Sequence, residues 1–248
     1  MKKTFYFAER NLKEMLRDPL SLFFGVVFPV VLLLLLSIIN RAIPAEAQMT
    51  LFHPEQLVPG IAVFSLSFIA LFVAMLIAKD RTSSFMLRLY TSPMTSSGFL
   101  FGYLLPLIPM VLAQLAVCFI TALCIGLHFT WNIFLCVLVC LPAALVFIAL
   151  GMLCGTLLSE KAVGGACGAL LTNLSAWLSG TWFSLEMIGG AFQTVAYILP
   201  FANAVDAGRS ALAGDYGGIW EHLWIVLAWG IGLMLLAVLV FRRKMKQH

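Results

Sequence analysis

Few residues in this sequence could carry out chemistry, and none of them forms a known catalytic pattern. There are six cysteines and four histidines, and no two cysteines have the Cys-x-x-Cys spacing of a zinc or redox motif. The sequence has no P-loop for nucleotide phosphates, no His-Glu-x-x-His motif and no Gly-x-Ser-x-Gly motif. We therefore expect a chain that is not an enzyme and holds no metal or cofactor. Any ATP that drives it would be hydrolysed by another subunit.

Three charged residues in the C-terminal third could form a polar site. Glu186, Asp206 and Arg209 lie in the stretch between two long apolar runs. Converging carboxylates can perform acid–base chemistry, which keeps a membrane-bound enzyme or assembly factor open as an alternative. The interpretation we prefer is that these residues anchor the segment at a membrane surface.

A second polar stretch, KDRTSSFMLRLYTSPMTSSG, covers residues 79–98. Its apolar residues next to Arg88 predict a short amphipathic helix, which Pro93 ends because the residue before a proline avoids helical geometry. Such a helix could insert into a groove on a partner protein, although a passive connector fits the same residues. The candidate partner contacts are Lys79, Asp80, Arg81, Phe85, Met86, Arg88, Leu89, Thr91, Ser92 and Pro93.

Residues 1–18 predict an amphipathic helix at a membrane interface. Its apolar residues recur at helical spacing, and charged residues fill the other face. Asp18 can cap the helix that follows, and Pro19 suits its first turn. The expected apolar face is Phe5, Ala8, Leu12, Met15 and Leu16, and the expected interfacial polar residues are Arg10, Lys13, Arg17 and Asp18.

The composition requires these segments to be positioned by membrane helices. The chain has 248 residues, of which 62% are hydrophobic and 10% charged, with a mean hydropathy of +1.03. Soluble domains carry about 25% charged residues, so a soluble enzyme is excluded. We predict an all-α polytopic membrane protein, because an apolar helix of about 20 residues crosses the bilayer. The six predicted spans are residues 20–40, 57–78, 99–126, 132–157, 162–185 and 221–241.

The basic residues set the predicted orientation. With six spans, all but two of the 15 lysines and arginines fall on one side, the exceptions being Arg41 and Arg209. By the positive-inside rule both termini are cytoplasmic and the chain lies in the cell membrane. Residues 186–220 form the outer segment, in which 187–205 is re-entrant or interfacial. A cleaved signal peptide ending near Ala45-Glu46-Ala47 is the competing interpretation of the start.

The spans themselves favour one class of transport. None of the predicted spans carries Asp, Glu, Lys or Arg at depth, whereas ion-coupled secondary transporters usually need such a group. An ATP-independent secondary transporter or channel remains the main alternative. Gly151 with Gly155, and Gly164 with Gly168, have the four-residue spacing that lets helices approach closely in lipid.

Several segments, in order along the chain, resemble the permease subunits of type-2 ATP-binding-cassette (ABC) exporters. They are RDP at 17–19, FMLRLYTSPM at 85–94 with FLFGYLLP at 99–106, SGTWFSLEM at 179–187 and AYILPFANAVDAGR at 196–209. The likeness extends over nearly the whole chain. It departs from the family at Ser84 to Leu87, where many members have Gly-Thr-x-Glu, and at Ser184 and Gly189-Gly190, where many have proline.

The resemblance implies one transmembrane domain, residues 1–248, with a coupling helix in residues 79–98 that contacts a separate ABC ATPase subunit. ATP and magnesium would be bound only there. A second copy of the permease, or a related permease, would complete the path, with membrane lipid around it and no nucleic acid. The expected cargo is a hydrophobic or amphipathic solute, such as an antibiotic, peptide, drug or lipid-linked compound, exported past aromatics such as Phe101, Tyr103 and Trp182.

Overall fold

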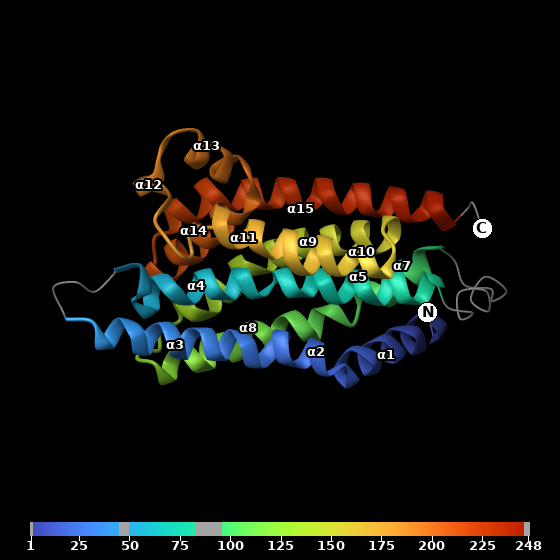
Figure 1. Cartoon of the computed structure of the whole chain (residues 1–248), viewed down its shortest axis with the longest axis horizontal. Helices are drawn as coiled ribbons and strands as arrows, with labels where there is room; N and C mark the ends of the chain where they lie inside the picture. Colours follow the sequence, from blue (N-terminus) through green and yellow to red (C-terminus); the bar gives the residue numbers. More distant parts are fainter. Residues whose placement is uncertain (1, 45–49, 83–95, 246–248) are drawn as a thin grey trace.

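The computed structural model describes residues 2–44, 50–82 and 96–245. Within these ranges the chain forms helices and no strand. The long helices lie side by side in one bundle, and the two chain termini lie at the same end of it (Figure 1). We call this the terminal end, and the other the distal end.

Five helical stretches are long and apolar enough to cross a membrane. They are Pro19–Ala42, Pro54–Thr82, Gly98–Cys124, Asn132–Leu157 and Tyr216–Lys244. The region of the predicted fifth span is also helical, but in three short pieces: α10 (Glu160–Val163), the π-helix η4 (Gly164–Leu171) and α11 (Thr172–Leu178). The chain is therefore a multi-pass helical protein, and a sixth crossing remains a prediction.

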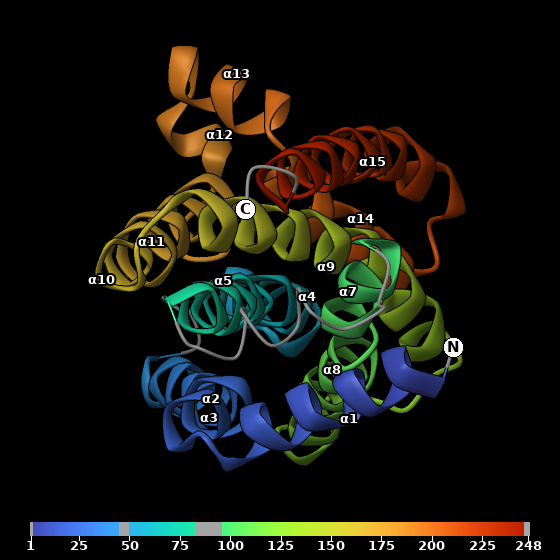
Figure 2. The same ribbon diagram turned by 90° about the vertical axis from the view of Figure 1, so that its right-hand side faces the viewer.

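The first stretch begins as its sequence predicts. Helix α1 (Lys2–Arg17) is followed by α2 (Pro19–Leu22), a π-helical turn η1 (Phe23–Val27) and α3 (Phe28–Ala42). The carboxylate of Asp18 accepts a hydrogen bond of 3.1 Å from the Ser21 amide, which confirms the predicted cap. Figure 2 shows α1 running sideways across the terminal end, from α2 toward α7.

The second stretch is the centre of the bundle. It consists of α4 (Pro54–Ser65) and α5 (Ser67–Thr82), and 89% of its most apolar 18 residues are buried, against 17% for α15 (Tyr216–Met245). The α4–α5 stretch therefore contacts protein on most sides, whereas α15 exposes most of its side chains. Helices α7 (Ser96–Leu104) and α8 (Leu107–Cys124) lie beside it and are separated from each other at Pro106.

Two glycines let the fourth stretch, α9 (Asn132–Leu157), approach α5 closely. A Cβ on Gly151 would lie 2.8 Å from Cα of Ala70, and one on Gly155 would lie 2.7 Å from the carbonyl oxygen of Ala74. The expected close approach is thus confirmed for this pair. It does not hold within the chain for Gly164, because a Cβ there would meet no atom within 4 Å.

The distal end carries a group of shorter helices. They are α12 (Leu185–Ile188), α13 (Gly190–Ile198) and α14 (Pro200–Ala213). Helix α14 packs between α9, α15 and α4, whereas α12 and α13 lie outside the main bundle beside α15 (Figures 1 and 2). Gly189 and Gly190 connect α12 to α13 with φ values of +63° and +58°, which favour glycine.

Candidate functional site

The predicted coupling helix lies outside the described residues, so Phe85, Met86, Arg88, Leu89, Thr91, Ser92 and Pro93 have no described geometry. The residues on either side of it are described. Lys79, Asp80 and Arg81 lie in the last turn of α5, and α7 begins at Ser96. The candidate site is therefore built from what holds these two flanking helices.

Asp80 is the centre of a polar cluster at the terminal end. Its side chain is only 2% exposed. Both of its carboxylate oxygens accept hydrogen bonds from Nη1 of Arg10, at 3.0 and 2.9 Å, and Oδ2 also accepts one of 2.9 Å from the Tyr103 hydroxyl. Because the buried carboxylate is paired and hydrogen-bonded, its charge is tolerated in an apolar surrounding. Arg10, Asn11, Glu14, Lys79, Asp80 and Tyr103 are called the Asp80 cluster below.

The Asp80 cluster attaches α1 to both flanking helices. On α5, Lys79 Nζ lies 3.0 Å from Glu14 Oε1. On α7, the Gly102 carbonyl accepts a hydrogen bond of 3.0 Å from Nδ2 of Asn11, a fully buried residue of α1. The Phe7 ring packs edge-on against Tyr103, with ring centroids 5.1 Å apart. One N-terminal helix thus contacts the chain immediately before and shortly after residues 83–95.

These contacts define the face of α1 that packs on the protein, and they correct the expectation for Tyr103. The buried face of α1 includes Phe7, Asn11 and Met15, whereas Phe5 and Leu16 are 61% and 49% exposed. A hydrophobicity pattern would not place the polar Asn11 on a buried face. Its side-chain amide is accommodated there because it donates a hydrogen bond to the Gly102 backbone carbonyl. Tyr103, expected beside a solute path, is instead buried against Asp80.

Arg81 joins α5 to α9. Its Nη1 donates to the carbonyls of Gly155 at 2.8 Å and Leu158 at 3.3 Å, and also to that of Thr156. These carbonyls lie at the C-terminal end of α9, where the helix leaves acceptors unpaired and where a cation is favourable. Three of the predicted contact residues, Lys79, Asp80 and Arg81, therefore have partners within the chain.

Arg209 joins three elements at the distal end. It donates from Nη1 to Asp206 Oδ1 at 3.0 Å, from Nη2 to the Gly180 carbonyl at 2.9 Å, and from Nε to the Gln56 carbonyl at 3.2 Å. Its side chain is 15% exposed. The guanidinium thus ties α14 to the start of α4 and to the turn between α11 and α12.

A hydrogen-bond network extends from Asp206 to α15. The Tyr197 hydroxyl donates to Asp206 Oδ2 at 2.9 Å. Burial, and then the neighbouring carboxylate, raise the pKa of Tyr197 to about 12, so the phenol keeps its proton at neutral pH. Asn203 donates through Nδ2 to the Tyr197 and Leu199 carbonyls, so its Oδ1, 2.9 Å from Nδ1 of His222, is the acceptor there.

These residues surround a cavity of about 530 Å³. Glu186, Asp206 and Arg209 all line it, so the structure brings the three predicted residues together. Arg209 and Asp206 are engaged with each other and with the backbone, and Glu186 is exposed. Asn11, Tyr197 and Asn203 received no role in the sequence analysis, which placed Tyr103 beside a solute path and not beside Asp80. A search for polar side chains within otherwise apolar helical faces could have found Asn11.

Loss of Arg209 is expected to loosen the distal helices. Arg209→Ala removes three hydrogen bonds from a charged donor, worth about 1.5–3 kcal/mol where such bonds are buried. Amide hydrogen exchange of residues 179–188 should then accelerate about tenfold or more. Glu186→Ala, which alters an exposed residue of the same cavity, should leave these rates unchanged. Equal rates in the wild type and in Arg209→Ala would contradict the joining role of Arg209.

The fold and the polar clusters define a multi-pass membrane domain whose ends are fastened by polar contacts. The sequence model of the family described as ABC-2 type transporter matches residues 2–213. The chain belongs to this family of ABC transporter permeases.

A relative supports the assignment at lower similarity. The chain is 26% identical over 194 residues to a protein named ABC transporter G family member 20 from Dictyostelium discoideum. The match covers 75% of this chain and 25% of that protein. The chain thus spans about a quarter of that relative's length, and its membership of the family makes it a permease domain of an ABC transporter.

Proposed function

We propose that the chain is the permease subunit of an ATP-driven exporter and works with a separate ATPase subunit. The observation that carries this proposal is the contact of α1 with both helices that flank residues 83–95. A segment that receives force from a moving partner must be fixed at its flanks, or its displacement is lost locally. The Asp80 cluster supplies such fixed points on α5 and α7.

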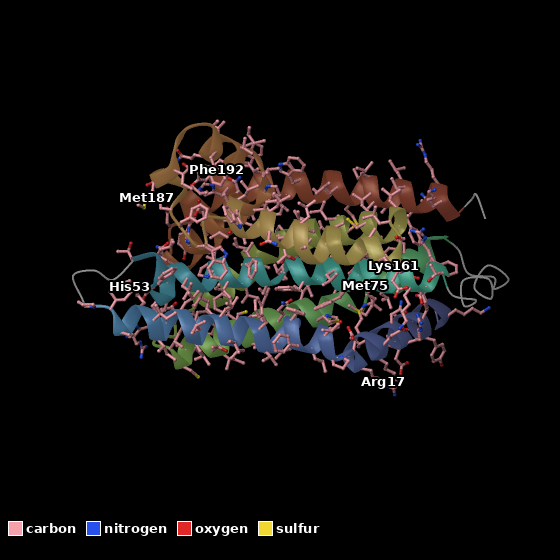
Figure 3. All side chains as sticks on the ribbon, viewed as in Figure 1. Arg17, His53, Met75, Lys161, Met187 and Phe192 are labelled. Carbon is pink, nitrogen blue, oxygen red and sulfur yellow. The ribbon has the colours of Figure 1, made fainter. Side chains whose placement is uncertain are left out.

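The charges support an orientation with the terminal end in the cytoplasm. Arg17 and Lys161 lie at the terminal end, whereas His53 and Met187 lie at the distal end (Figure 3). Arg242, Arg243 and Lys244 end α15 at the same terminal end. Basic residues collect on the cytoplasmic side of short loops, so this orientation places the coupling segment where an ATPase can bind.

A crevice of about 360 Å³ supports a hydrophobic or amphipathic cargo. Its apolar walls come from the start of the chain and from α5, while carboxylates and one ammonium group add a polar part. We propose that a second permease copy encloses this face and completes the path. The residues that line the crevice include Met15, Leu71, Phe72, Met75, Glu160 and Lys79.

The test is a purification of the tagged chain from its native membrane in mild detergent. We expect a nucleotide-binding protein in equal amount and ATP hydrolysis by the complex. Arg88→Ala and Pro93→Ala should abolish ATP-dependent transport or the association itself, whereas Lys161→Ala, in α10, should have little effect. A chain that purifies alone without ATPase activity would contradict the proposal and favour an ATP-independent transporter or a membrane enzyme.

A further inference from the structure

The central stretch is broken at its middle. The α-helical pattern ends at Ser65 and resumes at Ser67, about 20 Å from either end of the 29-residue stretch at 1.5 Å per residue. The Ser65 hydroxyl donates to the Ala62 carbonyl at 2.7 Å, and the Leu66 amide donates to Val63 at 3.1 Å. A serine that bonds its own preceding turn bends a helix in this way.

The break frees a backbone carbonyl that a neighbouring helix satisfies. The Ile69 amide donates to the Leu66 carbonyl at 3.0 Å. The Ser65 carbonyl accepts a hydrogen bond of 2.9 Å from Nε2 of Gln114 on α8. Interrupted membrane helices persist where such groups find partners within the protein. Gln114 thus caps the break from across the helix interface.

Two buried polar atoms, one on the capping side chain itself and one two residues after Ser65, have no hydrogen-bond partner within the described part of the chain. They are Ser67 Oγ and Gln114 Oε1, and their residues are 0% and 2% exposed. A buried polar group without a hydrogen bond costs about 1–3 kcal/mol. Buried water typically satisfies such groups, because one molecule can bond to about three of them.

The two halves of the stretch are fastened to different parts of the protein. Helix α4 is held at the distal end, where its Gln56 carbonyl accepts a hydrogen bond from Arg209. A Cβ on Gly60 would lie 2.8 Å from the methyl carbon of Thr181, so α4 packs closely on the turn between α11 and α12. Helix α5 carries Asp80 and Arg81, which bond to α1, α7 and α9. The break therefore lies between one half-helix that is held at the distal end and another that is held at the terminal end.

We propose that the Ser65–Ser67 break is a hydrated joint, in which Ser67 Oγ and Gln114 Oε1 bind an internal water molecule. Gln114 is its positioning residue, since it holds the freed Ser65 carbonyl. The water provides bonds that can be exchanged as the angle between α4 and α5 changes, so no polar group is left unpaired in the apolar interior. This inference goes beyond the proposed export function and does not depend on it.

Cysteines placed by the fold provide a test of the water site. Cys118 Sγ lies 4.0 Å from Ser65 Oγ, and both Cys118 and Cys140 are 0% exposed. In the purified full-length protein, X-ray radiolysis generates hydroxyl radicals from bound water, and these attack side chains within a few ångströms. Mass spectrometry should find Cys118 oxidised several-fold faster than Cys140. Equal rates for the two cysteines would overturn the proposed water site.

Two conservative variants sharpen this test. Ser67→Ala removes one proposed water ligand without changing the backbone, and should lower the Cys118 rate toward that of Cys140. Ser175→Ala removes a buried hydroxyl on α11 that bonds to Thr172 at 2.8 Å, and should leave the Cys118 rate unchanged. An unchanged rate in Ser67→Ala would also contradict the proposal.

Amide exchange tests the positioning role of Gln114. Gln114→Leu removes the cap, so amides of residues 66–70 should exchange about fivefold to twelvefold faster, as expected for one hydrogen bond of about 1–1.5 kcal/mol. Thr121→Val is the control on the same helix, since the Thr121 hydroxyl donates to the Val117 carbonyl within α8. Equal exchange in the two variants would overturn this role. Neither readout needs ATP or a cargo, so failure of the export function would leave the result interpretable.

Discussion

Gly151→Ala is expected to destabilise the protein strongly, because the added methyl group would meet the backbone of a neighbouring helix. The new Cβ would lie 2.8 Å from Cα of Ala70, well inside normal contact distance. A backbone atom cannot rotate away as a side chain can, so α5 and α9 must separate. Overpacking of this kind costs about 1–3 kcal/mol and more where the neighbour is rigid.

Thermal denaturation of the detergent-solubilised protein measures this effect. We expect the midpoint of Gly151→Ala to fall by roughly 6–12 °C, which corresponds to about 3 kcal/mol at about 2–4 °C per kcal/mol for this chain length. Gly232→Ala is the matched control, because Gly232 lies within α15 and a Cβ there would meet no atom within 4 Å. Alanine is favoured over glycine in helices, by up to about 1 kcal/mol. Similar midpoints for both variants would show that α5 and α9 do not pack as described.

Asp80→Ala is expected to have the second large effect, on both stability and coupling. The substitution removes the acceptor of bonds from Arg10 and Tyr103. Breaking a buried ion pair costs about 3–5 kcal/mol. Because the Arg10 side chain is 35% exposed and lies 2.5 Å from Glu14, we expect a loss somewhat below this range, about 2–3 kcal/mol.

A double-mutant cycle with Arg10→Ala isolates the interaction. The two single variants should each lose stability, and the double variant should lose less than their sum. Glu9→Ala is the control: its ion pair with Lys13 joins side chains that are 42% and 60% exposed, and such pairs contribute about 0.3–0.5 kcal/mol. If the proposed function holds, Asp80→Ala should also impair ATP-dependent transport while Glu9→Ala should not. A stability loss no larger than that of Glu9→Ala would contradict the role assigned to Asp80.

Features that depend on neighbouring residues could be predicted from the sequence. Apolar helices at 19–42, 54–82 and 132–157 follow from hydropathy, because a backbone in lipid must satisfy its own hydrogen bonds and helices do so locally. The Asp18 cap also follows from a local rule, because the Asp18 carboxylate accepts from the amide of Ser21, three residues later. The close approach at Gly151 follows from the glycine itself, which has no Cβ. Glu186, Asp206 and Arg209 could be grouped because they lie in the same segment between two long apolar runs.

Only the tertiary structure decided which polar groups are paired. Asp80 is one of several polar residues after an apolar run, and its partner Arg10 lies 70 residues earlier. The break at Leu66 is capped from α8, 49 residues away in sequence. Hydropathy and helical spacing report the average environment of a residue. A buried hydrogen bond instead depends on distances of about 3 Å between atoms brought together by packing. The sequence by itself therefore determined which segments form long apolar helices, whereas the contacts between helices determined which polar residues fasten them.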